Sequence, residues 1–152
     1  MCFELDARPP LPPIRGGASD ARGLLLTSGD GTRLSAYAAR ATEPAAPGPA
    51  APGSGAPGIV VIPDIRGLHP YYEELALRFA EAGVNAVAID LYARTAGTGS
   101  RDEDFDAQSH AAQARPDAVS ADVAAAVGYL RGRQGGSAAR VYTVGFCFGG
   151  RI

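Results

Sequence analysis

The sequence has few cysteines, no basic run and no long apolar segment, and each absence excludes a class of protein. Its 152 residues include two cysteines, Cys2 and Cys147, which are too few and too far apart for a disulfide framework or a zinc site. The formal net charge is −2, so we expect neither nucleic acid nor an acidic membrane surface as a partner. The start, MCFELDARPPLPP, lacks the basic end and apolar run of a signal peptide, and no segment reaches the ~18 apolar residues of a membrane span. We therefore expect a cytoplasmic protein that acts on a small molecule.

Most of the chain has the composition of a folded domain. Hydrophobic residues make up 46% of the sequence, which is enough for the core of one domain. Residues 43–58 are almost entirely Ala, Pro, Gly and Ser, as is typical of an exposed connection that buries no core. Residues 1–22 are rich in Pro, Gly and Arg without a clear period. We predict an irregular arm at 1–22, without a function of its own, and an α/β domain at 23–152.

The spacing of apolar residues changes repeatedly between that of strands and that of helices. Two short strands, 24–27 and 34–38, flank the Gly/Asp turn 28–31 and predict a hairpin. A β-branched run at 58–62 predicts a strand buried on both faces of a sheet. Alternating elements follow: a helix that contains Tyr72, Leu75, Ala76 and Phe79, a strand at 84–89, a short helix within 105–114 of the polar excursion 92–116, a helix that contains Val119, Val123, Val127 and Leu130, and a strand at 141–144. This order predicts an α/β fold, a mostly parallel sheet with helices on both faces.

The last predicted strand leads directly into Gly145-Phe146-Cys147-Phe148-Gly149-Gly150. This is a Gly-x-nucleophile-x-Gly pattern with cysteine in the usual serine position. The glycines leave room around a strained backbone, and the turn aims the sulfur at the N-terminus of the next helix, where unpaired N–H groups favour a thiolate. Cys147 is therefore predicted to be a nucleophile, and the alternative is a core cysteine in an inert turn.

Three stretches in the right order resemble the dienelactone hydrolase family. They are VVIPDIRGLHPYYEELALRFAEAG, VNAVAIDLYAR and VYTVGFCFGG, and they span about residues 58–152. The resemblance implies an α/β-hydrolase fold and a hydrolase of small carboxylic esters or lactones, with dienelactones as the leading substrate class. It implies no cofactor and no metal. In that family the turn cysteine attacks a cyclic enol ester, and an aspartate and a histidine that follow it in the chain complete the triad.

The resemblance also implies roles for individual residues. Cys147 matches the nucleophile. Asp64 stands where relatives usually carry a glutamate that contacts the thiol, and because it is one methylene shorter, the contact needs a water or is lost; a loop cap is the alternative. The backbone N–H groups of Ile65 and Phe148 match the oxyanion-hole donors. Arg94 matches an arginine that binds the substrate carboxylate, for which a guanidinium fork is suited; the alternative is a solvated loop charge.

Neither histidine of the sequence is the expected base of the triad. His69 and His110 both precede Cys147, whereas the base follows the nucleophile in this fold. His69 stands at a predicted helix start, where we expect a structural capping role. The sequence stops at Ile152, so we expect an incomplete domain without the triad aspartate and histidine, an inactive chain, and a strand 141–144 left at the sheet edge.

Two other functions fit the same residues. A general carboxylesterase or thioesterase would have no substrate carboxylate for Arg94 to bind. A binding module with the α/β-hydrolase fold would keep the turn without its chemistry. The sequence favours the ester or lactone hydrolase, because a strand, the cysteine and the glycines occur in the order that this chemistry requires.

Overall fold

One sheet of five strands, in the order β1-β2-β4-β3-β5, organises the computed structural model, which describes residues 2–42 and 55–152. The strands are β1 (Ala18–Thr27), β2 (Arg33–Ala41), β3 (Gly58–Ile62), β4 (Asn85–Ile89) and β5 (Val141–Gly145). The helices are α1 (Pro70–Glu81), α2 (Ala93–Ala96), α3 (Ala107–Ala111) and α4 (Pro116–Arg131), with the 3₁₀ turns η1 (Arg133–Gly135) and η2 (Cys147–Gly150). Most of the connection expected at 43–58 lies outside the described residues.

The sheet is mixed, and the connections explain which strands run parallel. Strand β3 pairs in parallel with both β4 and β5. Helices α1 and α4 connect β3 to β4 and β4 to β5, and a helical crossover of this kind is what parallel strands need. The hairpin β1-β2 is antiparallel, and β2 also pairs antiparallel with β4. The mostly parallel sheet expected from the sequence is thus parallel across β4, β3 and β5 and antiparallel at the hairpin.

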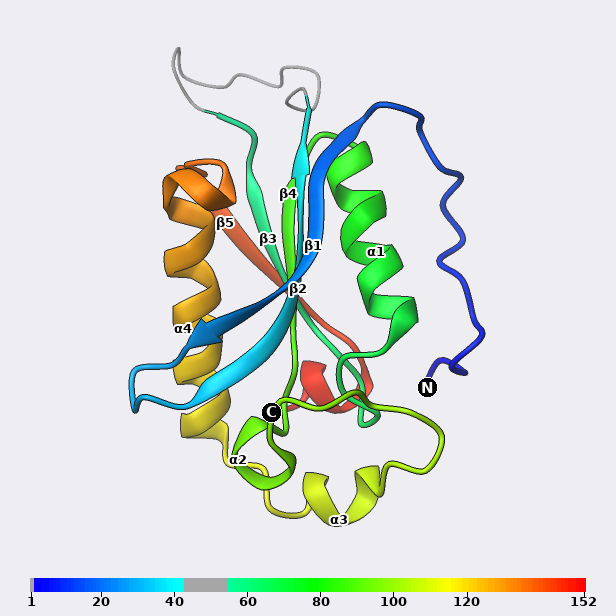
Figure 1. Ribbon diagram of the computed structural model, residues 1–152, viewed down its shortest axis with the longest axis vertical. Helices are drawn as coiled ribbons and strands as arrows, with labels where there is room; N and C mark the ends of the chain where they lie inside the picture. The colour runs from blue at the N-terminus through cyan, green and yellow to red at the C-terminus, as the bar shows by residue number, and fades with distance from the viewer. Residues whose placement is uncertain (1, 43–54) are drawn as a thin grey trace.

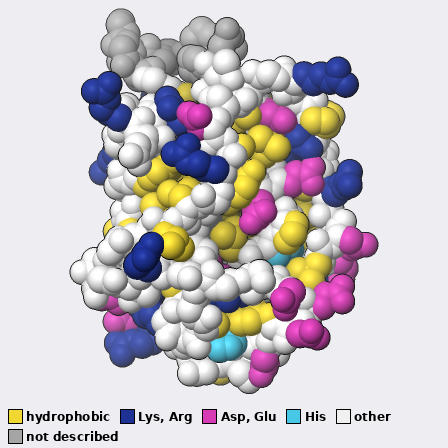
Figure 2. Space-filling view, in the orientation of Figure 1, with side chains coloured by type: hydrophobic (Ala, Val, Ile, Leu, Met, Phe, Trp, Pro, Cys, Tyr) yellow, Lys and Arg dark blue, Asp and Glu magenta, His cyan; other side chains and the backbone are white. Residues whose placement is uncertain are grey.

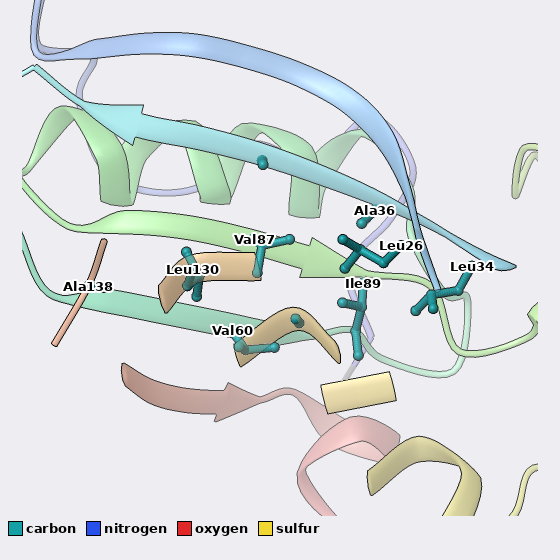
Figure 3. Packing of buried hydrophobic residues seen from close by; sticks show 10 residues of the cluster. Leu26, Leu34, Ala36, Val60, Val87, Ile89, Leu130 and Ala138 are labelled. Atoms are coloured by element: carbon teal, nitrogen blue, oxygen red, sulfur yellow. The ribbon is translucent and has the colours of Figure 1, made fainter. Parts of the chain in front are cut away.

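Helices α1 and α4 cover opposite faces of the sheet, as predicted (Figure 1). On the α4 side, Leu130 packs with Val60 and Val87 of the central strands (Figure 3). On the α1 side, Tyr72 packs against Val61. A fully buried side chain of this size contributes ~1.5–3 kcal/mol of transfer free energy, so these two clusters fix the three-layer arrangement.

Strand β1 begins earlier than its apolar residues indicate. It starts at Ala18, inside the segment 1–22 that was expected to be irregular, and its first residues are mostly exposed. Ala18 pairs with Ala41, with an irregularity between Ser19 and Arg22. Backbone hydrogen bonds rather than burial hold this end of the strand, so apolar spacing gives no signal for it.

Loops and short helices gather at the end of the sheet where β3 and β5 finish, and both chain termini lie there (Figure 1). Asp90, directly after β4, accepts hydrogen bonds from the backbone N–H groups of Leu68 and Tyr92. Its carboxylate also forms a buried bidentate ion pair with Arg101, at 3.1 and 2.8 Å. These bonds hold the excursion after β4 against the loop after β3, beside the turn that carries Cys147.

Candidate active site

Strand β5 ends in a sharp turn that carries Cys147. The Cys147 backbone has φ +49°, in the left-handed region that non-glycine residues rarely adopt. Such a conformation costs ~1–3 kcal/mol and persists only where the surroundings hold it. Here the Phe146 N–H donates to the Ile62 carbonyl at 3.0 Å, and the Gly149 N–H donates to the Pro63 carbonyl at 3.1 Å. The turn is thereby held against the loop after β3, with Cys147 exposed at its tip.

Glycines flank the cysteine because the turn has no room for side chains at these positions. A Cβ on Gly149 would lie 2.7 Å from two atoms of Ile62 and still closer to the Pro63 carbonyl oxygen. A Cβ on Gly145 would lie 2.7 Å from the carbonyl carbon of Gly149. Real Cβ atoms essentially never approach other atoms within 3.0 Å. The structure therefore gives the physical reason for both glycines of the sequence pattern.

The two expected oxyanion-hole donors lie on the turn itself and on the loop after β3, which hydrogen bonds hold against each other. Ile65 belongs to the loop after β3, and Phe148 directly follows Cys147. Within residues 2–42 and 55–152, no oxygen accepts a hydrogen bond from the backbone N–H of either residue. The Tyr92 hydroxyl donates to the Ile65 carbonyl at 2.6 Å, which fixes the orientation of that residue. Backbone N–H groups that lie beside a nucleophile and donate to no oxygen of the protein are what an oxyanion hole requires.

Asp64 is fully buried in the loop after β3, and it makes no hydrogen bond to Cys147 in the described part of the chain. One carboxylate oxygen accepts from the Arg66 N–H at 2.9 Å, as a loop cap does, and the other accepts from the Phe3 N–H at 2.9 Å. Its own N–H donates to the Tyr72 hydroxyl at 3.0 Å. The direct contact that a longer glutamate would make with the thiol is therefore not formed here.

The first residues of the chain lie on the turn, although no pattern in the sequence predicts this contact. The arm runs along α1 to the end of the sheet where η2 lies (Figure 1), and the Cys2 sulfur is 3.7 Å from the Cys147 sulfur. The Phe3 ring stacks on Tyr71, with centroids 3.9 Å apart, and meets the Phe146 ring edge-on at 5.9 Å. Sequence reasoning missed this contact because the arm has no period and 145 positions separate the two cysteines.

The two thiols differ in acidity. The hydrogen bond with Cys2 lowers the pKa of Cys147 below the ordinary thiol value, and the Phe148 N–H lowers that pKa further. Burial raises the pKa of Cys2, and the hydrogen bond to Cys147 and the charge of Asp64 raise it further. With Cys2 as the S–H donor of this pair, Cys147 is the first of the two to become a thiolate.

We expect the alkylation of Cys147 by iodoacetamide to rise with pH through a midpoint below the ~8.5 of a free thiol. The thiolate is the reactive form, so a lowered pKa moves the rise in rate to lower pH. Cys2→Ala removes the S–H donor and should move the midpoint to higher pH. Mass spectrometry of the peptide that contains Cys147 measures both profiles, and Arg115→Ala, at a surface ion pair, is the control. Identical midpoints in the parent and Cys2→Ala proteins would contradict the donor role.

Arg94 is bound by carboxylates of the protein itself. Its Nη1 and Nη2 donate to Asp122 at 2.7 and 2.9 Å, and its Nε donates to Asp30 at 2.8 Å. Nη2 also donates to the Ser28 hydroxyl at 3.2 Å. The bonds to Asp122 and then Asp30 raise the pKa of Arg94, and the same guanidinium holds the pKa of Asp30 well below its usual range. These contacts join α2 to α4 and to the hairpin turn, and none of them brings Arg94 to Cys147.

Neither histidine contacts Cys147 in the described residues. His69 is the N-cap residue of α1, but its side chain forms no capping bond, and only its backbone carbonyl accepts from the first turn. The ring is buried edge-on against Tyr72, with Nε2 4.0 Å from Asp64 Oδ1, and burial lowers the pKa of His69. His110 stacks on Phe105 at 4.9 Å.

A cavity of about 480 Å³ lies between the arm and the excursion after β4. It is lined by Glu4, Leu5, Asp6, Arg66, Asp102, Glu103, Phe105 and Ala107. Acidic side chains also gather at the lower right of Figure 2, the region where Figure 1 places the N-terminus. Four carboxylates and one guanidinium give this cavity a negative character. In the part of the chain that the structure describes, no group of three or more His, Cys, Asp or Glu side chains is placed to hold a metal ion.

Known proteins share this sequence pattern. Residues 41–152 match the sequence model of the Dienelactone hydrolase family. A protein of Methylorubrum extorquens named for carboxymethylenebutenolidase is 35% identical over 95 residues, which are 62% of this chain and 33% of that protein.

Solved structures share the fold. A Klebsiella pneumoniae protein named for dienelactone hydrolase gives a TM-score of 0.64 at 26% identity, over 86% of this chain and 52% of that chain. The dienelactone hydrolase-like promiscuous phosphotriesterase P91, from metagenomic libraries, gives 0.58 at 27% identity, over 88% of this chain and 51% of that chain. The chain thus spans about half of these structures and a third of the Methylorubrum protein. Because the family pattern covers most of the sequence and the fold agrees with it, the chain belongs to the dienelactone hydrolase family.

Proposed function

We propose that the protein hydrolyses small carboxylic esters or lactones with Cys147 as the nucleophile, and that dienelactones are the leading substrate class. The observation that carries this proposal is the left-handed backbone of Cys147, at φ +49°. The turn that holds it has no room for side chains at the glycines on either side. A cysteine that only fills space is normally buried, whereas this one is exposed and has a lowered pKa. Strain of this kind is typical of a residue held for chemistry.

In the proposed reaction the Cys147 thiolate attacks the carbonyl carbon, and the carbonyl oxygen becomes an oxyanion. The N–H groups of Ile65 and Phe148 receive that charge, and one such donor is typically worth ~10²–10³ in kcat. The C–O bond breaks as the carbonyl re-forms, which releases the alcohol of an ester or opens the ring of a lactone and gives a thioester on Cys147 that water then hydrolyses. We assign Asp64 a positioning role. Its carboxylate accepts from the Arg66 N–H in the loop that carries Ile65, and from the Phe3 N–H of the arm.

We assign the general base of this mechanism to a histidine that is paired with an aspartate. Both would lie in the part of the family fold that these 152 residues do not cover. The buried His69 has no bond to Cys147, and the His110 ring is stacked on Phe105. Without that base the thiolate forms slowly and the leaving group is not protonated. Inactivity of residues 1–152 alone therefore stays a prediction that depends on this assignment.

A second candidate, a carboxylesterase or thioesterase for neutral substrates, is favoured by the contacts of Arg94. The family resemblance implies that Arg94 binds a substrate carboxylate, but its guanidinium already forms a bidentate pair with the buried Asp122. Releasing the pair to bind a substrate would leave a buried carboxylate unpaired, which is strongly unfavourable. We therefore assign Arg94 a structural role.

In a form of the protein that also contains the proposed histidine and aspartate, here called the full-length protein, we expect Arg94→Ala to lower the free energy of unfolding by ~2–3 kcal/mol, because Asp122 loses its partner. The KM values for an anionic lactone and for a neutral ester of similar size should change by similar factors. Urea unfolding and steady-state hydrolysis of both substrates measure these effects. Arg115→Ala is the control, since its pair with Asp117 is exposed and worth ~0–1 kcal/mol. A KM that rises at least ~10-fold more for the anionic lactone, with unchanged stability, would return Arg94 to the substrate site.

No helix that the structure describes is long and apolar enough to cross a membrane. The cytoplasmic location expected from the sequence stays a prediction.

The alternative function, a binding module without chemistry, would keep the turn but tolerate loss of the Cys147 sulfur. The substitutions of Cys147 described below distinguish it from a hydrolase.

A further inference from the structure

The two cysteines of the sequence are close enough to react with each other. Their sulfur atoms lie 3.7 Å apart, and both are free thiols. A disulfide bond is about 2.05 Å long, so the sulfurs need to approach by less than about 2 Å to form one. Because the pair joins positions 2 and 147, the folded chain rather than local sequence brings the thiols together.

The arm is fixed on both sides of Phe3, so Cys2 is not carried by a free tail. The Phe3 N–H donates to Asp64 at 2.9 Å, and Arg66 Nη1 donates to the Phe3 carbonyl at 2.8 Å. Arg66 also pairs with Glu4 at 3.0 Å. The ring of Phe3 is packed in the aromatic cluster with Tyr71. These contacts keep the Cys2 thiol at a high effective concentration beside Cys147.

The two thiols are placed for different steps of an oxidation. Cys147 is exposed at the tip of the turn, where a small oxidant reaches it, whereas Cys2 is half-buried. Cys147 is also the more acidic thiol of the pair, and thiolates are the form that peroxides oxidise.

We propose that Cys2 and Cys147 form a reversible disulfide when the protein meets hydrogen peroxide, with Cys147 oxidised first and Cys2 as the resolving thiol. The Cys147 sulfur attacks one peroxide oxygen, the O–O bond breaks, and a sulfenic acid and water form. The Cys2 sulfur then loses its proton and attacks the Cys147 sulfur, the S–O bond breaks, and a second water leaves. One peroxide is reduced by two electrons, one from each thiol, and a dithiol reductant reverses the change.

The disulfide is a modification separate from hydrolysis, but it would control the hydrolytic activity. The disulfide would remove the nucleophile and lock the arm over the turn, so hydrolysis would stop until the bond is reduced. It would also protect Cys147 from further oxidation to a sulfinic acid, which ordinary thiols do not reduce. Cys2 would thus preserve a reactive sulfur that the turn exposes.

The experiment treats the purified full-length protein with a small excess of hydrogen peroxide and analyses tryptic peptides without reduction. We expect a linked pair of the peptides that contain Cys2 and Cys147, which disappears on treatment with dithiothreitol. In Cys2→Ser the linked pair is absent, and Cys147 sulfinic acid should accumulate at least ~10-fold faster than in the parent. Phe3→Ala keeps both cysteines but loosens the arm, and it should form the linked pair more slowly. Circular dichroism checks that each variant is folded.

Other outcomes would overturn the proposal. They are the absence of the linked pair in the folded parent, equal sulfinic acid formation in the parent and Cys2→Ser, and unchanged linking in Phe3→Ala. The linked pair is read by mass and needs no hydrolytic activity, so its failure is distinct from failure of the proposed function. Where the protein does hydrolyse esters, the loss of activity on oxidation should follow the linked pair and return with dithiothreitol.

Discussion

Replacing Cys147 by alanine in the full-length protein is expected to lower kcat/KM for a neutral aryl ester by at least ~1000-fold. Removal of the nucleophile in comparable hydrolases costs several powers of ten even when the fold and oxyanion donors remain. Steady-state hydrolysis measures the loss, and circular dichroism checks the fold. Cys147→Ala that keeps more than a tenth of the activity would assign the chemistry to another residue.

Cys147→Gly separates the strain of the turn from its chemistry. Glycine adopts the left-handed backbone at φ +49° without the ~1–2 kcal/mol that a Cβ costs there. Activity should be lost as fully as in the alanine variant, while the free energy of unfolding should rise by ~1 kcal/mol relative to it. Equal stability of the two variants in urea would mean that the turn stores no strain at this residue.

The second large effect is expected from Gly149→Ala. The added Cβ would lie 2.7 Å from two atoms of Ile62 and still closer to the Pro63 carbonyl oxygen, so the turn must move away from the loop after β3. Overpacking of this kind costs ~1–3 kcal/mol of stability. A displacement of ~1 Å at a catalytic group lowers the rate by ~10²-fold, so kcat/KM should fall by at least that factor.

Gly128→Ala is the matched control for this substitution. Gly128 lies in α4, and a Cβ there would have no atom within 4 Å. The same chemical change should raise the free energy of unfolding by ~0.5–1 kcal/mol and leave kcat/KM unchanged, because alanine is the better helix former. Full activity of Gly149→Ala would show that contact between the turn and the β3 loop does not position the nucleophile.

These effects depend on the way two parallel strands meet at one end of the sheet. Strands β3 and β5 are neighbours, so the loop with Ile65 and the turn with Cys147 begin side by side. The bonds from Phe146 and Gly149 to the β3 segment then tie the two together. The nucleophile and both proposed oxyanion donors are thus set by a single strand pairing.

Elements with a strong local signal were predictable from the sequence. The run 58–62 is β3, and the apolar spacing around Tyr72 is α1, because burial on one or both faces dictates these patterns. The turn around Cys147 was predictable because sterics demand glycine at fixed offsets. In each case the residues that specify the structure are close together in the chain.

Contacts between distant residues were not predictable in this way. Arg94 is 28 and 64 positions from Asp122 and Asp30, and no short pattern links an arginine to carboxylates so far away. The docking of Phe3 and Cys2 on the turn depends on a segment without periodicity. Both depend on tertiary packing, and both change the interpretation of the site.

The most direct test of Cys147 as the nucleophile is to locate the acyl group during turnover. Full-length protein mixed with an activated aryl ester and quenched in acid within the first turnover should carry the acyl group as a thioester on the peptide that contains Cys147, and Cys147→Ala should carry none. An acyl group found on a different residue, or full hydrolysis by Cys147→Ala, would contradict the assignment of Cys147 as the nucleophile.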